Sequence, residues 1–348
     1  MKKTSVVAIN LSSARIPVLV AVFLMCVFVS TLLCKALPPV QIGGDFVKVL
    51  LYSGSSFKKE SLPPTGVFSL LNVTEKTVSA KKEDLSANTQ IPLPVENISA
   101  RTPAVAANAE VKISNSTKSD IRAENFLGTV PPFLKEDFSV LIVHTHTTES
   151  YTPSEKYRYT PSDTDRTTDK NYNMVRVGEE IAKVLTQQGI KVYHDTTIND
   201  YPSYNGSYNR SAANISNYIK NDPSIKIVLD VHRDAIEGQN GEKIKYTSKI
   251  NSETAASVML VVGSNLSGLE HNNWEENMRF ASQLQRHISS LYPTLMRPIN
   301  FRSQRFNQQL APGGIIVEVG TNGNTLDEAI LGGKLFAEGL ADFVKSQN

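Results

Sequence analysis

The chain of 348 residues carries a formal net charge of +2, with 36 lysine and arginine residues interspersed among 34 aspartate and glutamate residues. This balance excludes the strongly basic surface of a typical nucleic-acid-binding protein, so no nucleic-acid partner is expected. Its two cysteines, Cys26 and Cys34, share one apolar segment, which excludes disulfides and cysteine-bound zinc from everything that follows.

That apolar segment predicts attachment to a membrane. Residues 16–33 form a stretch of 18 residues without a charge, nearly enough for a helix to cross a hydrocarbon core about 30 Å thick. Two lysines and Arg15 precede it, so the positive-inside rule leaves residues 1–15 in the cytoplasm. We therefore expect a single-pass transmembrane helix over residues 16–36 in the cell membrane, with the C-terminal domain extracytoplasmic. A cleaved signal peptide is the alternative.

Residues 37–135 show no sustained hydrophobic period and predict a membrane-proximal region followed by a disordered, flexible stalk. Proline, serine, alanine and asparagine are frequent between residues 76 and 120, a composition that cannot bury a core. A flexible segment of about 90 residues would reach on the order of 50 Å. Such a stalk would let the C-terminal domain act well away from the membrane.

Residues 136–348 predict one α/β domain. Apolar runs of strand length lie at residues 139–143, 190–193, 225–231, 258–262 and 315–319. Helical periodicity separates them at residues 173–188, 212–219 and 275–291, and a capping box formed by Thr325 and Glu328 opens a last helix that ends near residue 344. Strands that alternate with helices imply a mostly parallel sheet flanked by helices on both faces. In such sheets functional groups lie at the carboxyl ends of the strands.

Histidines and a carboxylate lie at the ends of three of these strands. His144 and His146 follow the first strand, His232 ends the third, and Glu318 lies in the last. Neutral imidazole and carboxylate groups are zinc ligands, and a catalytic zinc keeps one position open for water. The sequence therefore predicts a catalytic zinc site at this edge of the sheet, with Glu318 as the group that takes and returns protons.

Three other functions fit parts of this pattern. Residues 232–234 read His-Arg-Asp, as in protein kinases, but no glycine-rich phosphate loop or Asp-Phe-Gly motif accompanies them. A metal-dependent amidohydrolase barrel also places His-x-His after its first strand, yet it typically needs ~250 residues. A non-catalytic wall-binding scaffold is the third alternative, and the intact set of His146, His232 and Glu318 argues against it.

Five segments in order resemble the stage II sporulation protein P family of endospore-forming bacteria. They span residue 139 to the C-terminus and read HTHTTESY, NYNMVRVGEEIAKVLTQQGIKVYHD, SYNGSYNRSA, IVLDVHRDA and IIVEVGTNGNTLDEA. That family is in turn similar to the zinc-dependent N-acetylmuramoyl-L-alanine amidases. The resemblance implies a zinc amidase-like fold and a peptidoglycan hydrolase that cuts the amide between glycan and stem peptide, and also cross-linking peptides.

The resemblance also implies roles for individual residues. The zinc ligands it gives are His146, Glu149 and His232. Glu318 matches the catalytic glutamate of the amidases. His144 is an alternative to the first histidine, and Asp169, which precedes the first helix, is an alternative acidic ligand. Arg233 is a candidate substrate-binding residue.

The biological setting that the resemblance implies is sporulation. The family thins septal cell wall while the forespore is engulfed, so peptidoglycan would be the substrate. It works beside the glycan-cleaving stage II sporulation protein D and a third membrane protein of the same stage. These partners follow from the resemblance alone.

Overall fold

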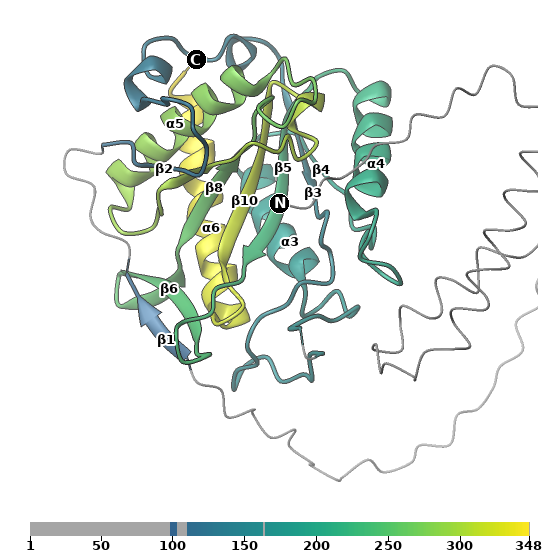
Figure 1. The fold of residues 1–348 in the computed structure, drawn as a ribbon, viewed down its shortest axis with the longest axis vertical. Coiled ribbons are helices and arrows are strands. Elements are labelled where there is room, and N and C mark those ends of the chain that lie inside the picture. The colour runs from purple at the N-terminus through teal and green to yellow at the C-terminus, as the bar shows by residue number, and fades with distance from the viewer. Residues whose placement is uncertain (1–97, 103–109, 163, 348) are drawn as a thin grey trace, which may run out of the picture. The chain divides into compact units, whose positions relative to one another are not determined.

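A seven-stranded sheet is the centre of the computed structural model, which describes residues 98–102, 110–162 and 164–347 (Figure 1). In spatial order its strands are β2 (Ile113–Asn115), β9 (Ile299–Phe301), β8 (Val258–Val262), β10 (Gly313–Thr321), β5 (Ile225–Asp234), β3 (Ser139–Val143) and β4 (Val192–His194). Neighbouring strands run parallel except β8 and β10, which run antiparallel. The predicted α/β class is confirmed, and the sheet is mixed.

A second, three-stranded sheet was not predicted from the sequence. Its order is β1 (Ile98–Arg101), β6 (Lys243–Ile250) and β7 (Glu253–Ala256), and β1 pairs in parallel with β6 while β7 pairs antiparallel. The turn between β6 and β7 uses Asn251 and Ser252, whose φ angles are 48° and 69°. Positive φ at both central residues is typical of a two-residue hairpin turn. This hairpin was missed because lysines interrupt the apolar pattern of β6.

Three helices cover one face of the large sheet. They are α3 (Met174–Gln187), α5 (Trp274–Leu291) and α6 (Leu326–Lys345), and their buried side chains form one core with alternate residues of the strands, such as Ile142, Leu229 and Val317. On the other face α4 (Ser207–Asn221) packs Ile215 against Leu141. Helices therefore lie on both faces, as predicted, but α4 covers only the part formed by β3 and β5.

No α-helix packs against the other face of β8 and β10 in the described part of the chain. Met259, Val261 and Ile316 form a small apolar cluster there, against which Phe306 packs from the loop that precedes β10. This loop also contains the short 3-10 helix η5 (Gln308–Leu310). The sheet therefore leaves a face on which polar side chains of neighbouring strands can meet.

Local signals define where the predicted helices begin and end. The Asn173 side chain accepts a hydrogen bond from the Val175 amide (3.0 Å) and caps α3. Gly189, with φ of 82°, ends that helix in the left-handed conformation that glycine tolerates best. Thr325 and Glu328 form the expected capping box at the start of α6.

Elements before residue 136 join the same core. The 3-10 helices η3 (Ala123–Phe126) and η4 (Pro132–Lys135) bury Phe126 and Phe133 against it. None of the described helices is long and apolar enough to cross a membrane. The predicted transmembrane helix over residues 16–36 and the part of the predicted stalk up to residue 97 lie outside the described residues. The described residues between 98 and 135 differ from the predicted flexible stalk, because β1 and β2 pair with strands of the domain and two 3-10 helices pack on its core.

A tight contact between α6 and β7 gives a test of the packing. An alanine Cβ at Gly332 would lie 2.3 Å from the carbonyl oxygen of Ala256, a backbone atom of a strand that is paired with β6 and so cannot shift as easily as a side chain. We expect Gly332→Ala to lower the free energy of unfolding by roughly 1–3 kcal/mol. This loss would occur although alanine stabilises a helix by about 1 kcal/mol relative to glycine. Urea unfolding of the purified chain measures the change.

Gly333→Ala is the matched control in the same helix. Its Cβ would lie 3.1 Å from Val177 Cγ1, the end of a side chain that can shift. A loss for Gly332→Ala no larger than that for Gly333→Ala would contradict this account of the contact.

Candidate active site

A buried group of charged side chains lies at the carboxyl end of β5. His232 is 3% exposed, its Nδ1 lies 3.4 Å from Glu149 Oε2, and its Nε2 lies 2.9 Å from Asp230 Oδ1 without hydrogen-bond geometry. Burial alone would lower the pKa of His232, but the two carboxylates reverse this and hold its pKa well above the ordinary value. The imidazole is thus fixed between Asp230 and Glu149.

The loop after β3 brings Glu149 to this cluster. Arg233 donates its backbone N–H to Glu149 Oε2 (3.3 Å), and Arg166 Nη2 lies 3.4 Å from Glu149 Oε1. Burial would raise the pKa of Glu149, but the contact with His232 and the neighbouring positive charges outweigh it and hold the pKa at about 2. Glu149 is therefore a carboxylate at neutral pH.

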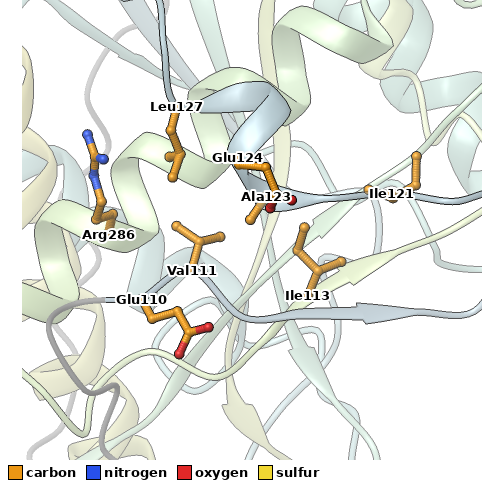
Figure 2. Close-up of a pocket in the computed structure, with 8 residues that line it drawn as sticks. All are labelled: Glu110, Val111, Ile113, Ile121, Ala123, Glu124, Leu127 and Arg286. Carbon is orange, nitrogen blue, oxygen red and sulfur yellow. The ribbon is translucent and has the colours of Figure 1, made fainter.

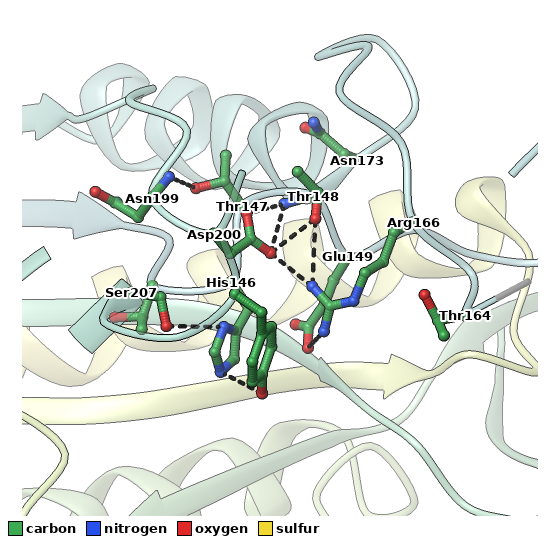
Figure 3. A network of polar contacts seen from close by, with 12 residues as sticks. His146, Thr147, Thr148, Glu149, Thr164, Arg166, Asn173, Asn199, Asp200 and Ser207 are labelled. Atoms are coloured by element: carbon green, nitrogen blue, oxygen red, sulfur yellow. Dashed lines mark hydrogen bonds and ion pairs between the residues drawn. The ribbon is translucent and has the colours of Figure 1, made fainter. Parts of the chain in front are cut away.

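Arg166 joins this loop to a second buried carboxylate (Figure 3). Its Nη1 lies 2.6 Å from Asp200 Oδ2, and Asp200 also accepts hydrogen bonds from the N–H (3.0 Å) and hydroxyl (2.7 Å) of Thr148. The Arg166 guanidinium lies over the ring of Tyr204, 5.0 Å from its centroid. Asp200 thus holds Thr148, the residue before Glu149, and also Arg166, whose guanidinium lies beside the Glu149 carboxylate. Both contacts keep Glu149 in place.

His146 lies beside His232 and beneath a tyrosine. The two imidazole centroids are 5.3 Å apart, and Tyr204 stacks on His146 at 4.5 Å. The hydroxyl of Tyr204 is 3.0 Å from His146 Nε2, and that of Ser207 is 3.4 Å from Nδ1, as Figure 3 shows for His146 and Ser207. Burial lowers the pKa of His146. Nothing in the sequence of the segment that carries Tyr204 indicates this contact.

Glu318 enters the site from β10. It is the register partner of His232 on β5, so both side chains lie on the same face of the sheet. Its Oε2 is buried and has no hydrogen-bond partner among the described residues. Burial raises the pKa of Glu318 to about 8, with a further contribution from Asp234 and partial opposition from His232. Near neutral pH this carboxyl group therefore holds a proton.

The alternative residues of the sequence analysis lie elsewhere. His144 is fully buried with Nδ1 3.0 Å from the Val231 carbonyl and Nε2 2.9 Å from His194 Nε2. Burial and the charge of His194 lower its pKa to about 3. Asp169 is exposed and accepts hydrogen bonds within its own turn, from the N–H and side chain of Asn171. The structure does not bring either residue to the cluster.

The side chain of Arg233 turns toward the loop that follows Glu149. Its guanidinium donates to backbone carbonyls of this loop, including those of Ser150 (2.7 Å) and Asp165 (3.0 Å). These hydrogen bonds position the loop. None of them tests whether Arg233 binds substrate, so that role stays a prediction.

A catalytic zinc ion is typically held by three protein ligands and one water. Among the described residues, no group of three or more histidine, cysteine, aspartate or glutamate side chains is already arranged to hold a metal. Two of the predicted ligands are nevertheless well spaced: 3.4 Å between His232 Nδ1 and Glu149 Oε2 equals the roughly 3.4 Å between ligands of a tetrahedral zinc with bonds of about 2.1 Å. Asp230 beside His232 is also the carboxylate–histidine pairing that orients metal ligands. The ring nitrogens of His146, the third predicted ligand, lie near the hydroxyl groups of Tyr204 and Ser207.

A separate cavity of about 490 Å³ lies against α5 (Figure 2). Its apolar wall includes Val111 and Ile113, and its charged residues are Glu110, Glu124 and Arg286. None of the candidate residues lines it, and α5 covers the face of the sheet opposite to Glu318. The cavity is therefore not part of the candidate active site.

Sequence comparison gives matches over most of the chain. The family model described as stage II sporulation protein P matches residues 59–341. The stage II sporulation protein P of Bacillus subtilis (strain 168) is 26% identical over 231 residues, which cover 63% of this chain and 54% of that protein. The chain thus matches about half the length of this curated relative.

Solved structures with a similar arrangement include amidases, all at low similarity. The catalytic domain of the CD27L endolysin targeting Clostridia difficile has a TM-score of 0.37 at 13% identity, covering 61% of this chain and 98% of its own. The N-acetylmuramoyl-L-alanine amidase from Clostridium difficile 630 has a TM-score of 0.35 at 16% identity, covering 61% and 97%. Similarity at this level is too low to transfer a residue's role to this chain.

The raised pKa of Glu318 predicts that the metal-free chain loses stability as pH rises. The unfolded chain releases this proton near pH 4.5 and the folded chain near pH 8, so ionisation favours unfolding increasingly across that window. The total effect is on the order of a few kcal/mol, absent below the window and complete above it. Glu318→Gln cannot ionise and should escape this loss.

Urea unfolding in the presence of a chelator tests the prediction. Glu318→Gln should gain stability relative to the parent between about pH 4 and about pH 8.5. A difference between variant and parent that stays constant across this range would show that folding does not raise the pKa of Glu318.

Proposed function

The chain belongs to the stage II sporulation protein P family, and from this premise we propose that it is a zinc-dependent peptidoglycan hydrolase acting in sporulation. The proposed reaction is hydrolysis of the amide between the lactyl group of the glycan and the stem peptide, as in N-acetylmuramoyl-L-alanine amidases, and of cross-linking peptides as an endopeptidase. The observation that carries the proposal is the meeting of His146, Glu149, His232 and Glu318 at one edge of the sheet.

Three of these residues would hold the zinc ion. Glu149 and His232 face each other at ligand spacing, and the imidazole of His146 lies beside that of His232. The contacts of Asp230 with His232 and of Arg166 with Glu149 would keep the donors oriented. Zinc, when bound, supplies Lewis acidity and lowers the pKa of its water to roughly 7.

Glu318 would move the proton that amide hydrolysis requires. Its Oε2 is buried on the same face as His232 and has no competing partner among the described residues. A carboxyl group with a pKa of about 8 exchanges a proton readily near neutral pH. In this role its ionised form takes a proton from the attacking water, and the protonated form then delivers that proton to the amide nitrogen that leaves.

The proposed location and partners follow from the sequence and the family. Residues 16–36 would anchor the chain in the cell membrane, with the hydrolase domain outside the cytoplasm. Because β1 and β2 already pair with strands of this domain, residues 37–97 would provide its reach to the wall. Within the family's setting the chain would act beside stage II sporulation protein D and a third membrane protein of that stage during engulfment.

Two substitutions separate metal binding from catalysis. His232→Ala removes a ligand, so we expect zinc affinity to fall by more than about 100-fold and the release of muropeptides from purified peptidoglycan to stop. Glu318→Gln keeps all three ligands, so it should retain about one zinc per chain while turnover falls by roughly 10²–10⁴-fold. Zinc content and muropeptide release by the purified chain, alone and with the partner proteins, are the measurements.

Asp169→Asn is the matched control, since it removes an exposed carboxylate that lies away from the cluster. It should keep both zinc and activity. Loss of zinc in Asp169→Asn would instead favour Asp169 as the acidic ligand. A parent chain that binds no zinc and releases no muropeptide under any of these conditions would leave a wall-binding scaffold as the function.

A further inference from the structure

A second polar cavity lies on the same face of the sheet as Glu318. It has a volume of about 360 Å³, within the range of small-ligand sites, and its lining includes Asp234, Tyr246, Met259, Arg297, Pro298 and Asn300. Met259 is the register partner of Glu318, and Asp234 lies two residues after His232 on β5. Because side chains alternate along strands, both point to the face that carries the catalytic candidates.

The register of the next strand places the cavity across the sheet from Glu318. Asn300 on β9 pairs with Val261, which lies two residues after Met259 on β8, so all three share this face. Arg297 comes just before β9. Two strand spacings separate β10 from β9, about 10 Å in all. A peptide that starts at Glu318 would cover this distance in roughly three residues.

Arg297 is the charged group of this cavity. Its guanidinium lies over the ring of Tyr246, 4.2 Å from the centroid, and its Nη1 lies 3.0 Å from Asp234 Oδ2. Only 9% of the residue is exposed. A guanidinium carries five N–H donors, and the contact with Asp234 is the one side-chain hydrogen bond of Arg297 among the described residues.

An arginine whose side chain is already fixed in this way is suited to bind a carboxylate. Stacking on Tyr246 and pairing with Asp234 fix the plane of the guanidinium, so little conformational freedom is lost when a second carboxylate binds. An unpaired buried cation would be costly, and Asp234 reduces this cost while leaving donors for a ligand. The cavity thus offers a positive group at a fixed distance from Glu318.

We propose that this cavity is the subsite for the stem peptide and that Arg297 binds the free carboxylate of an acidic residue near the start of that peptide. The proposal rests on the hydrolase function proposed above and adds a substrate preference to it. An acidic residue second in the stem peptide would reach Arg297 when the amide before the first residue lies at Glu318, because the guanidinium reaches Asp234 on β5, two residues after His232. Substrates in which this carboxylate is an amide should bind less well.

Binding of two peptides to the full-length chain tests the proposal without any requirement for cleavage. The probes are L-alanyl-D-glutamate with its γ-carboxyl blocked as an amide and its α-carboxylate free, and the same dipeptide with both carboxyl groups amidated, titrated by calorimetry. We expect the parent to bind the acid about 10- to 100-fold more tightly, the ratio that loss of a charged hydrogen bond gives. Arg297→Gln should bring the ratio close to one, and Arg297→Lys should restore part of it.

Arg286→Gln is the matched control, since it removes an arginine that lines the cavity against α5, away from this face (Figure 2). It should keep the preference of the parent. Equal binding of both peptides by the parent, or an unchanged ratio in Arg297→Gln with unaltered thermal stability, would overturn the proposal. If Arg297→Gln unfolds, Arg297→Lys decides by the same ratio.

The outcomes also separate this proposal from the proposed function. A parent that prefers the acid peptide but releases no muropeptides would support the subsite and count against the hydrolase. A parent that cleaves peptidoglycan but does not distinguish the two peptides would support the hydrolase and overturn the subsite.

Discussion

The arrangement around β5 depends on the cost of burying charge. Asp230 and Glu149 are both buried, and an isolated buried carboxylate would destabilise the fold by several kcal/mol. His232 lies between them, and Thr145 donates two hydrogen bonds to Asp230, from its N–H and its hydroxyl. The loop that carries Glu149 is therefore held against β5 by the same charges that form the candidate site. Glu318 is the exception, since its buried oxygen has no partner in the described structure.

The parts of the fold that the sequence predicted are those with strong local signals. The apolar run of β3 and the capping box of α6 each indicated an element that the structure contains. Short or interrupted strands were missed: β9 has three residues, and β6 alternates lysines with apolar residues because it is only half-buried. Their pairing depends on partners far away in the chain, which a local pattern does not encode.

Some residues of the candidate site were predicted from the sequence and others were not. Strand ends predicted that the groups of His146, His232 and Glu318 would meet at one edge, and the structure brings them there. Residues on loops carry no such signal in the sequence. The contacts of Tyr204 with His146 and of Arg166 with Glu149 are therefore visible only in the structure. Asp230 was overlooked although it lies two residues before His232 on the same strand, and strand alternation could have identified it.

His144 illustrates how a residue outside the cluster can still be constrained. Its ring lies against Gly178 of α3, where an added Cβ would be 2.6 Å from two of its atoms and 2.7 Å from His194 Nε2. No side chain at position 178 fits while both imidazoles remain. The three positions should therefore be inherited together among relatives, with larger residues at 178 arising only where the histidine pair has been replaced by smaller side chains. Such covariation would record a packing constraint and not a shared role in chemistry.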